Sequence, residues 1–351
     1  MSDPTIQTFC CHHNEKQEGV TIQIMDEFNT ESYNTVCLVS STIGILGAMY
    51  QIFQNGAQRL RSPNRGRSII MWLAVADLLA SLGVLVRSSF WLRYKNILPL
   101  PDDNASVLFC SITSAWTQYF YTATWFWTLF YAVDIWHSIQ GRDTRPLLYH
   151  SLAWGIPAAT TSVGLSILYI PNATCHNITS LSSVLLRILP NYCATYVPIA
   201  LVMIINPVIY ILAGNKIEMT VALPLAQFTS KERRVVDALR LKFFLINVVF
   251  YVCWLPNLIN GILIWTMWST MPVKAIITIW YIMALMNPMQ ALLNALVYRK
   301  WHVTERRFQP MFHSEHKELN YNDEQSPLLG SEPSRMLLAP IPSTINNYAT
   351  L

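Results

Sequence analysis

The sequence predicts an all-α membrane protein built as a bundle of seven transmembrane helices. Of its 351 residues, 52% are hydrophobic and 13% are charged, and this charged fraction is about half that of typical soluble domains. Long apolar segments make up most of the chain, and a run of about 20 such residues can cross a bilayer as a helix. Lys and Arg gather in alternate connecting loops, as they do in multi-spanning proteins. The predicted spans, which together form a helical domain over 33–298, are residues 33–54, 68–92, 108–140, 147–170, 191–213, 241–267 and 274–298.

The distribution of positive charge predicts the orientation of the bundle. Because cytosolic loops are enriched in Lys and Arg, the C-terminus is predicted in the cytosol and the N-terminus in a lumen or outside the cell. The acceptor triplets that begin at Asn104, Asn172 and Asn177 fall in loops of the opposite face, which predicts glycosylation there. The basic loops are 55–67, 141–146, 214–242 and the residues after 298.

The first two spans have different roles in this prediction. Residues 1–32 are polar and acidic with no signal-peptide core, so the first span is expected to act as an uncleaved signal. The second span carries Asp77 near its middle, and a carboxylate in lipid is costly unless it is paired. We expect Asp77 to belong to an activation switch with Asn287 and Asn294 as partners; the alternative is a hydrogen-bonding hub without a signalling role. Arg87, near the outer end, would meet a ligand carboxylate or extend to the headgroups.

The third span is predicted to be the central helix, because it contains no Gly or Pro and no formal charge before Asp134. Its outer half offers Trp116, Gln118 and Tyr119, and aromatic faces with a few amides and hydroxyls suit a small aromatic ligand. Most aromatic residues in so rich a span must nevertheless pack in the bundle or face lipid.

Two further features predict an activation switch, one at the cytosolic end of the third span and one inside the sixth span. Asp134 would hold a cation from a neighbouring helix or loop, or would simply anchor the helix at the interface. In the sixth span, Pro256 removes a backbone hydrogen bond and kinks the helix. Trp254 is expected to point into the bundle beside that kink, so that the helix acts as a lever; the alternative is that Pro256 only shapes the helix. The candidate cations for Asp134 are Lys242, Arg240 and Arg145.

Four of the seven cysteines fall on the predicted luminal side: Cys10 and Cys11 in the N-terminal segment, and Cys110 and Cys175 beside the bundle. Cys110 begins the third span and Cys175 lies in the following luminal loop, where an oxidising compartment would allow a disulfide. The alternatives are that Cys175 is free or pairs with Cys10 or Cys11.

The residues after the last span predict a membrane-associated segment and a tail. Residues 299–312 are expected to form a short amphipathic helix on the membrane, and 313–351 a disordered cytosolic tail. Glu324 with Leu328 and Leu329 has the spacing of an acidic dileucine, and Tyr348 with Leu351 that of a tyrosine-based signal. These patterns favour sorting adaptor complexes as partners and endosomal, lysosomal or melanosomal delivery; coincidence is the alternative.

The motifs of common enzymes are missing from the predicted membrane domain. It contains no G-x-S-x-G elbow, paired-acid site, H-E-x-x-H motif or phosphate-binding loop, so neither catalysis nor a metal or cofactor is predicted. A formal net charge of +4, spread along the chain, does not favour nucleic acid as a partner.

Several landmarks resemble rhodopsin-class G-protein-coupled receptors. These are LAVADLL with Asp77, the pair Cys110 and Asp134, and CWLP with Trp254 and Pro256. The sequence departs from that class at Ile135, where the class has Arg, which puts its ionic lock in doubt. The segment PMQALLNALVY is instead similar to the seventh helix of cyclic-AMP-type and secretin-type receptors.

A closer resemblance covers most of the seven-span region. The blocks TFCC, VRSSFWL, FYAVD, LLYHSLAWG and MNPMQ resemble the ocular-albinism receptor family of melanosomes and late endosomes. The resemblance implies coupling to heterotrimeric G proteins, arrestin binding and a tyrosine-pathway ligand such as L-DOPA, with dopamine or tyrosine competing. It also implies a role in melanosome biogenesis and a location in melanosomal, lysosomal and plasma membranes. The rival classes are a transporter or channel, although internal repeats and paired broken helices are not found, and a trafficking protein that does not signal.

Overall fold

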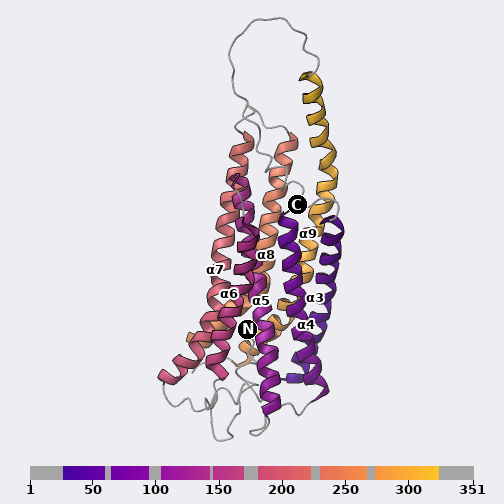
Figure 1. Cartoon of the computed structure of the whole chain (residues 1–351). Coiled ribbons are helices and arrows are strands. Elements are labelled where there is room, and N and C mark those ends of the chain that lie inside the picture. Colours follow the sequence, from indigo (N-terminus) through magenta and orange to yellow (C-terminus); the bar gives the residue numbers. More distant parts are fainter. Residues whose placement is uncertain are drawn as a thin grey trace, which may run out of the picture.

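The computed structural model describes residues 27–59, 65–94, 104–142, 145–169, 181–222, 230–266 and 273–323. Every regular element in these ranges is an α-helix, and the helices run side by side as an elongated bundle (Figure 1). They are α3 (Thr30–Arg59), α4 (Arg65–Arg93), α5 (Asn104–Ile139), α6 (Pro146–Tyr169), α7 (Leu181–Ala222), α8 (Ser230–Thr266) and α9 (Val273–Asp323).

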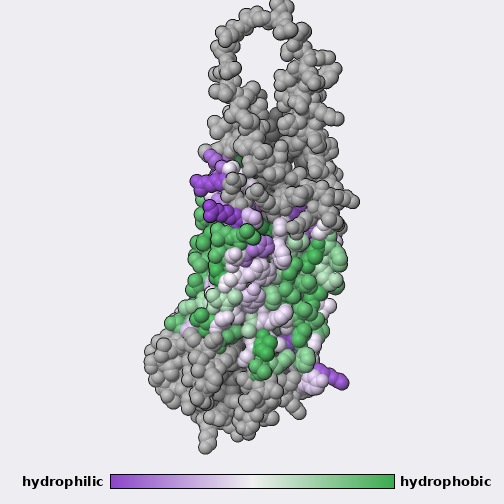
Figure 2. Space-filling view, in the orientation of Figure 1, coloured by the Kyte–Doolittle hydropathy of each residue, from purple (hydrophilic) through white to green (hydrophobic). Residues whose placement is uncertain are grey.

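Five of these helices are long and apolar enough to cross a membrane. Figure 2 shows hydrophobic residues across the middle of one face of the bundle, with hydrophilic residues toward its two ends. The described part of the chain is therefore the helical bundle of a multi-pass membrane protein. The five segments are Thr30–Ala57, Gly66–Arg93, Leu189–Ile217, Val236–Leu263 and Val273–Tyr298.

The third and fourth predicted spans, α5 and α6, are helical but are not among these five. Helix α5 is rich in Trp, Tyr, Thr and Ser, and α6 contains His150, Gly155 and Pro157 beside its Thr and Ser residues. All of these lower the mean hydropathy of a segment even when their side chains are buried. Both helices nevertheless lie within the bundle, since α5 packs against α4, α6 and α7, and α6 packs against α5 and α7.

Helix contacts define a ring of six helices with α6 on its outside. Around the ring, α3 packs on α4, α4 on α5, α5 on α7, α7 on α8, α8 on α9, and α9 back on α3. Side chains of α5 additionally reach α8 and α9, through Trp125 against Trp254 and Tyr131 against Tyr298. The prediction that the third span is the central helix is therefore confirmed.

Several helices extend beyond their predicted limits. Helix α7 begins at Leu181 instead of near 191 and ends at Ala222 instead of near 213, and α8 begins at Ser230 instead of near 241. The predictions followed hydropathy, which falls where charged residues begin. Lys, Arg, Glu and Ala are strong helix formers, so a helix continues through them.

One further boundary differs from the prediction. The structure has a single helix, α9, over Val273–Asp323, where we expected a break after 298, a separate helix over 299–312 and no helix from 313. No Gly or Pro occurs between Pro288 and Pro310 to end the helix at the predicted place. How this extension lies relative to a membrane stays a prediction.

Local hydrogen bonds fix two helix ends that position the site. Asn29 caps α3, because its Oδ1 accepts from the Ser32 amide at 2.9 Å. Gly141 ends α5 with a φ of 68°, a conformation that glycine adopts without strain. The Arg142 amide then donates to the His137 carbonyl at 3.0 Å, which completes the Schellman motif just after Asp134.

Candidate functional site

Asp77 of α4 is buried inside the bundle, with 2% of its surface exposed. Asn294 of α9 donates a hydrogen bond from Nδ2 to Asp77 Oδ2 at 3.1 Å. Burial of a carboxylate is costly, and an amide donor offsets part of that cost. The structure thus confirms Asn294 as a partner of Asp77.

The other predicted partner, Asn287, forms hydrogen bonds with a different helix. It exchanges two hydrogen bonds with Asn257 of α8: Asn257 Nδ2 donates to Asn287 Oδ1 at 2.9 Å, and Asn287 Nδ2 donates to Asn257 Oδ1 at 3.2 Å. This reciprocal amide pair connects α8 to α9 immediately after Pro256. Asn257 was not predicted as a site residue, although an Asn inside an apolar span is itself a signal of function.

Trp254 points into the bundle, as predicted, and is 1% exposed. Its indole Nε1 donates to Gln290 Oε1 of α9 at 2.6 Å. Its ring meets two aromatic residues of α5 nearly edge-on, Trp125 at 4.8 Å and Tyr121 at 5.1 Å between centroids. Trp254 therefore connects the lever helix α8 to both α5 and α9.

These contacts share one face of α9. Asn287, Gln290 and Asn294 are spaced three and four residues apart, so their side chains lie along the same side of the helix. Through this polar face α9 binds Asp77 of α4 and two residues of α8. A movement of α9 or α8 must therefore break or exchange several buried hydrogen bonds together, which is the behaviour of a two-state element.

The five predicted ligand residues do not converge on one site. Arg87, Gln118 and Trp254 are buried, and Gln118 Nε2 donates to Thr195 Oγ1 of α7 at 3.4 Å. Trp116 is 42% exposed and Tyr119 packs toward α6.

The positions of Trp116 and Tyr119 are explained by their contacts with α4 and α6. Gly83 of α4 lacks a side chain, and a Cβ there would lie 2.5 Å from Trp116 Cδ1. The indole therefore crosses α4, and its Nε1 donates to the Leu79 carbonyl at 2.8 Å. The Tyr119 ring stacks with Trp154 of α6, 6.2 Å between centroids. Both aromatics anchor α5 to its neighbours.

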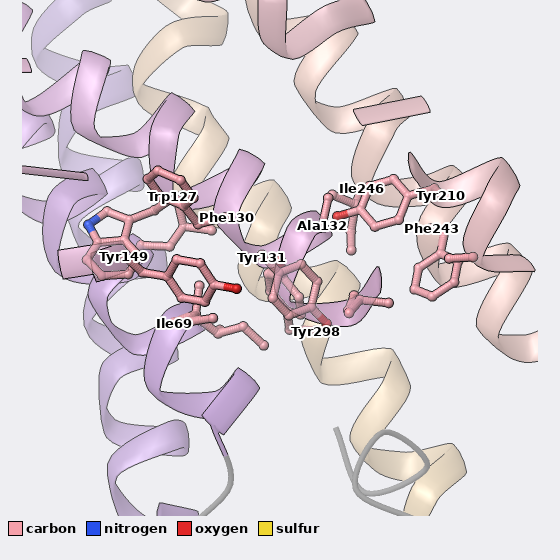
Figure 3. Close-up of a cluster of buried hydrophobic side chains, with 14 of the residues drawn as sticks. Ile69, Trp127, Phe130, Tyr131, Ala132, Tyr149, Tyr210, Phe243, Ile246 and Tyr298 are labelled. Atoms are coloured by element: carbon pink, nitrogen blue, oxygen red, sulfur yellow. The ribbon is translucent and has the colours of Figure 1, made fainter. Parts of the chain in front are cut away.

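A second group of buried polar residues lies at the end of the bundle predicted to be cytosolic. Asp134 of α5 and Lys242 of α8 are 1% and 3% exposed. The Lys242 Nζ lies 5.5 Å from the ring centroid of Tyr131 in α5 and 5.7 Å from that of Tyr298 in α9. Figure 3 shows Tyr131 and Tyr298 close together between the surrounding helices. Tyr131 precedes Asp134 by three residues, so both side chains lie on one side of α5.

The other candidate cations lie elsewhere. Arg240 runs along α7, with its Nε 3.6 Å from the position of a Cβ on Gly214, and Arg145 is exposed. Arg67, at the start of α4, is buried and was not predicted. Its position in a basic loop concealed it, because the sequence does not show which loop cation turns inward.

Only some of the remaining predicted site residues are among those that the structure describes. Cys110 is disulfide-bonded, whereas Cys37, Cys193 and Cys253 form no disulfide. Cys175 lies outside the described residues, so its pairing with Cys110 stays a prediction. Asn104 is the first residue of α5. Also outside the described residues are Cys10, Cys11, Asn172, Asn177, Glu324, Leu328, Leu329, Tyr348 and Leu351.

Comparison with known proteins agrees with the resemblance stated from the sequence blocks. The family model described as ocular albinism type 1 protein matches residues 1–334. The G-protein coupled receptor 143 of Homo sapiens is 28% identical over 360 residues, which cover 96% of this chain and 86% of the human protein. Because the family model spans nearly the whole chain, including every helix described above, the protein belongs to the ocular albinism type 1 protein family.

Proposed function

We propose that the protein is a G-protein-coupled receptor for a small tyrosine-derived ligand. L-DOPA is the ligand that the family resemblance implies, with dopamine or tyrosine as competitors. Heterotrimeric G proteins are the transducers and arrestin is a further partner. The proposal is supported by the family assignment and by the similarity to a protein named as a G-protein-coupled receptor.

The observation that carries the proposal is the polar face of α9. Its Asn287, Gln290 and Asn294 bind α8 and α4 by buried hydrogen bonds. A buried polar network is stable only when every member has a partner, so it favours a few discrete arrangements over a continuous range. A receptor requires such discrete arrangements, because a ligand acts by shifting the population between them.

The resting state is held at the predicted cytosolic end by Lys242. A buried ammonium is strongly disfavoured without a negative or π-electron partner. Tyr131 and Tyr298 supply two aromatic rings, and Asp134 is the buried carboxylate on the same side of α5. We assign Asp134 as the countercharge of Lys242. This contact takes the place of the rhodopsin-type ionic lock, whose Arg is replaced by Ile135 in this sequence.

The ligand enters from the predicted luminal end and acts on Trp254. Gln118 and Arg87 are the buried polar residues in the luminal half that suit an amino-acid ligand, because an amide and a guanidinium bind a carboxylate or hydroxyl. A ligand that displaces the Tyr121 or Trp254 ring would disturb the Trp254–Gln290 hydrogen bond. Pro256 then converts this local change into a tilt of α8.

The cellular location follows from the tail and the family. The dileucine pattern at Leu328 and Leu329 and the tyrosine pattern at Tyr348 favour capture by sorting adaptors. We therefore propose that the receptor resides in melanosomal, late endosomal and lysosomal membranes, with a fraction at the plasma membrane. Its proposed role is to regulate melanosome biogenesis.

A G-protein biosensor assay tests the proposal. Alanine replaces Leu328, Leu329 and Tyr348, so that the receptor accumulates at the cell surface, and L-DOPA, dopamine and tyrosine are added in turn. We expect a saturable response to L-DOPA that the other two compounds reduce. No response to any of them with every G-protein class, from receptor that is folded and at the surface, would refute it.

The same variant separates the receptor from the rival classes. Uptake of labelled L-DOPA into vesicles without a biosensor response would identify a transporter. Asp134→Asn tests the trafficking alternative, because a protein that does not signal would show the same biosensor baseline and the same location with either residue.

A further inference from the structure

The structure contains two helix carbonyls that precede a proline and are bound by a hydroxyl from a neighbouring helix. Proline has no amide hydrogen, so the carbonyl four residues before it loses its helical donor. In α7, Pro207 leaves the Met203 carbonyl in this state, and the Tyr251 hydroxyl of α8 donates to it at 2.7 Å. In α9, Pro288 does the same for the Ala284 carbonyl, and the Ser40 hydroxyl of α3 donates to it at 2.7 Å.

The Tyr251 bond lies close to Pro256, where α8 is expected to kink. Tyr251 lies five residues before Pro256, in the N-terminal part of α8, which also contains Lys242. At a rise of 1.5 Å per residue, Tyr251 is about 7 Å and Lys242 about 21 Å from the kink. A tilt about Pro256 therefore displaces Lys242 about three times as far as Tyr251. The tilt that separates Lys242 from its partners leaves the Tyr251 hydroxyl near the Met203 carbonyl.

Contacts farther along the same arm also join α8 to α7. Tyr210 of α7 and Phe243 of α8 stack with their ring centroids 4.8 Å apart, as the right side of Figure 3 shows. Arg240 of α8 lies along Gly214 of α7. On the same arm, Lys242 faces the rings of Tyr131 in α5 and Tyr298 in α9.

We propose that the Tyr251–Met203 hydrogen bond couples α7 to α8, so that the two helices move as one unit when the seam between α8 and α5 opens. Tyr251 is then a positioning residue: it keeps α7 beside the moving arm and does not itself hold the resting state. This inference rests on the proposed function, because that function requires an arm that moves.

Distances between spin labels test the coupling without any ligand. Spin-labelled non-natural residues replace Asn215 on α7 and Asp237 on α8, two exposed positions near the same end of the bundle. A second label pair replaces Arg142, just after α5, and Asp237. Pulsed electron–electron double resonance on purified full-length protein then measures the α7–α8 and the α5–α8 distances.

We expect Tyr251→Phe, which removes only the hydroxyl, to broaden the α7–α8 distance distribution and to lengthen its mean. The matched control is Ser40→Ala, which removes the equivalent hydroxyl at Pro288 and is expected to leave the α7–α8 distribution unchanged. Pro207→Ala is a second route, because the new amide supplies a helical donor to the Met203 carbonyl and competes with Tyr251. It is expected to broaden the distribution as Tyr251→Phe does.

Lys242→Met separates this inference from the proposed function. It is expected to lengthen the α5–α8 distance while the α7–α8 distance distribution stays narrow. Addition of Tyr251→Phe to this variant is expected to broaden the α7–α8 distribution. If Lys242→Met leaves the α5–α8 distance unchanged, the proposed resting-state contact is wrong, and the effect of Tyr251→Phe on α7–α8 still decides the coupling. An α7–α8 distribution as narrow in Tyr251→Phe and Pro207→Ala as in the wild type would overturn the coupling.

Discussion

At the scale of single residues, Trp254 is the side chain through which α8 contacts two other helices. Its indole nitrogen is bound by Gln290, and its ring lies against Tyr121 and Trp125. The hydrogen bond orients the ring, and the aromatic contacts fill the space around it. Loss of either interaction is therefore expected to affect the position of α8 as well as stability.

Trp254→Phe keeps an aromatic ring but removes the donor to Gln290. The unpaired Gln290 amide and the smaller ring are expected to lower the free energy of unfolding by about 1–3 kcal/mol. Thermal unfolding in detergent measures the loss. Gln290→Leu in the Trp254→Phe background provides the control, because it removes the unpaired acceptor and should add little further destabilisation. Full additivity of the two substitutions would contradict the hydrogen bond.

Asp77 and Asn294 form a pair whose polarity can be exchanged. Asp77→Ala leaves the Asn294 amide unpaired in the interior and is expected to cost about 1–3 kcal/mol. The double exchange Asp77→Asn with Asn294→Asp restores one carboxylate and one amide at the same contact. We expect the double variant to be more stable in thermal unfolding than Asp77→Ala. If the double variant is less stable than Asp77→Ala, the surroundings of Asp77, and not its hydrogen bond with Asn294, determine which side chain is tolerated at position 77.

At the scale of helices, α3 packs closely on α9 because glycines, which have no side chain, occur along the interface. A Cβ on Gly47 would lie 2.5 Å from the Leu292 Cα, whereas a Cβ on Gly56 of the same helix would meet nothing within 4 Å. The close approach allows Ser40 to reach the Ala284 carbonyl. Helix α9, which carries the polar face, is thus also packed closely against α3.

Gly47→Ala is expected to push α3 away from α9 and to destabilise the protein by about 1–3 kcal/mol, since backbone atoms cannot yield as side chains do. Gly56→Ala is the matched control in the same helix. It should stabilise the protein by up to about 1 kcal/mol, because Ala has the higher helix propensity. Thermal unfolding of both variants checks the signs, and equal effects would contradict the close packing.

At the scale of the whole molecule, the disulfide of Cys110 fixes the outer end of α5 to another part of the chain. A disulfide of this kind typically contributes about 2–4 kcal/mol, mainly by restricting the unfolded chain. Cys110→Ser is expected to lower the unfolding temperature accordingly.

The partner of Cys110 is identified by comparing single substitutions. Cys175→Ser should destabilise the protein as much as Cys110→Ser if the predicted pair is correct, and the double variant should add nothing. Peptide mapping by mass spectrometry under non-reducing conditions gives the same answer directly. An equal effect of Cys10→Ser or Cys11→Ser, with none from Cys175→Ser, would assign the bridge to the N-terminal segment.

The order and approximate position of the described bundle helices could be predicted from the sequence, because hydropathy depends on residues within one segment. The inward direction of Trp254 and the pairing of Asp77 with Asn294 also followed from local reasoning, since polar residues in an apolar helix turn toward the interior. Helix ends were less accurate, because a charged residue ends an apolar run without ending a helix.

Apart from the pairing of Asp77 with Asn294, the partners across the bundle were decided by the tertiary structure. Periodicity indicates which face of a helix is buried, but it does not indicate which neighbour that face meets. For this reason Asn287 bonds to Asn257 and not to Asp77, and Trp116 lies outward over Gly83. Lys242 and Arg67 are buried, although in the sequence they look like other cations beside a membrane. A hydrogen bond between helices depends on the rotation and depth of both, and only the packed bundle defines these two quantities.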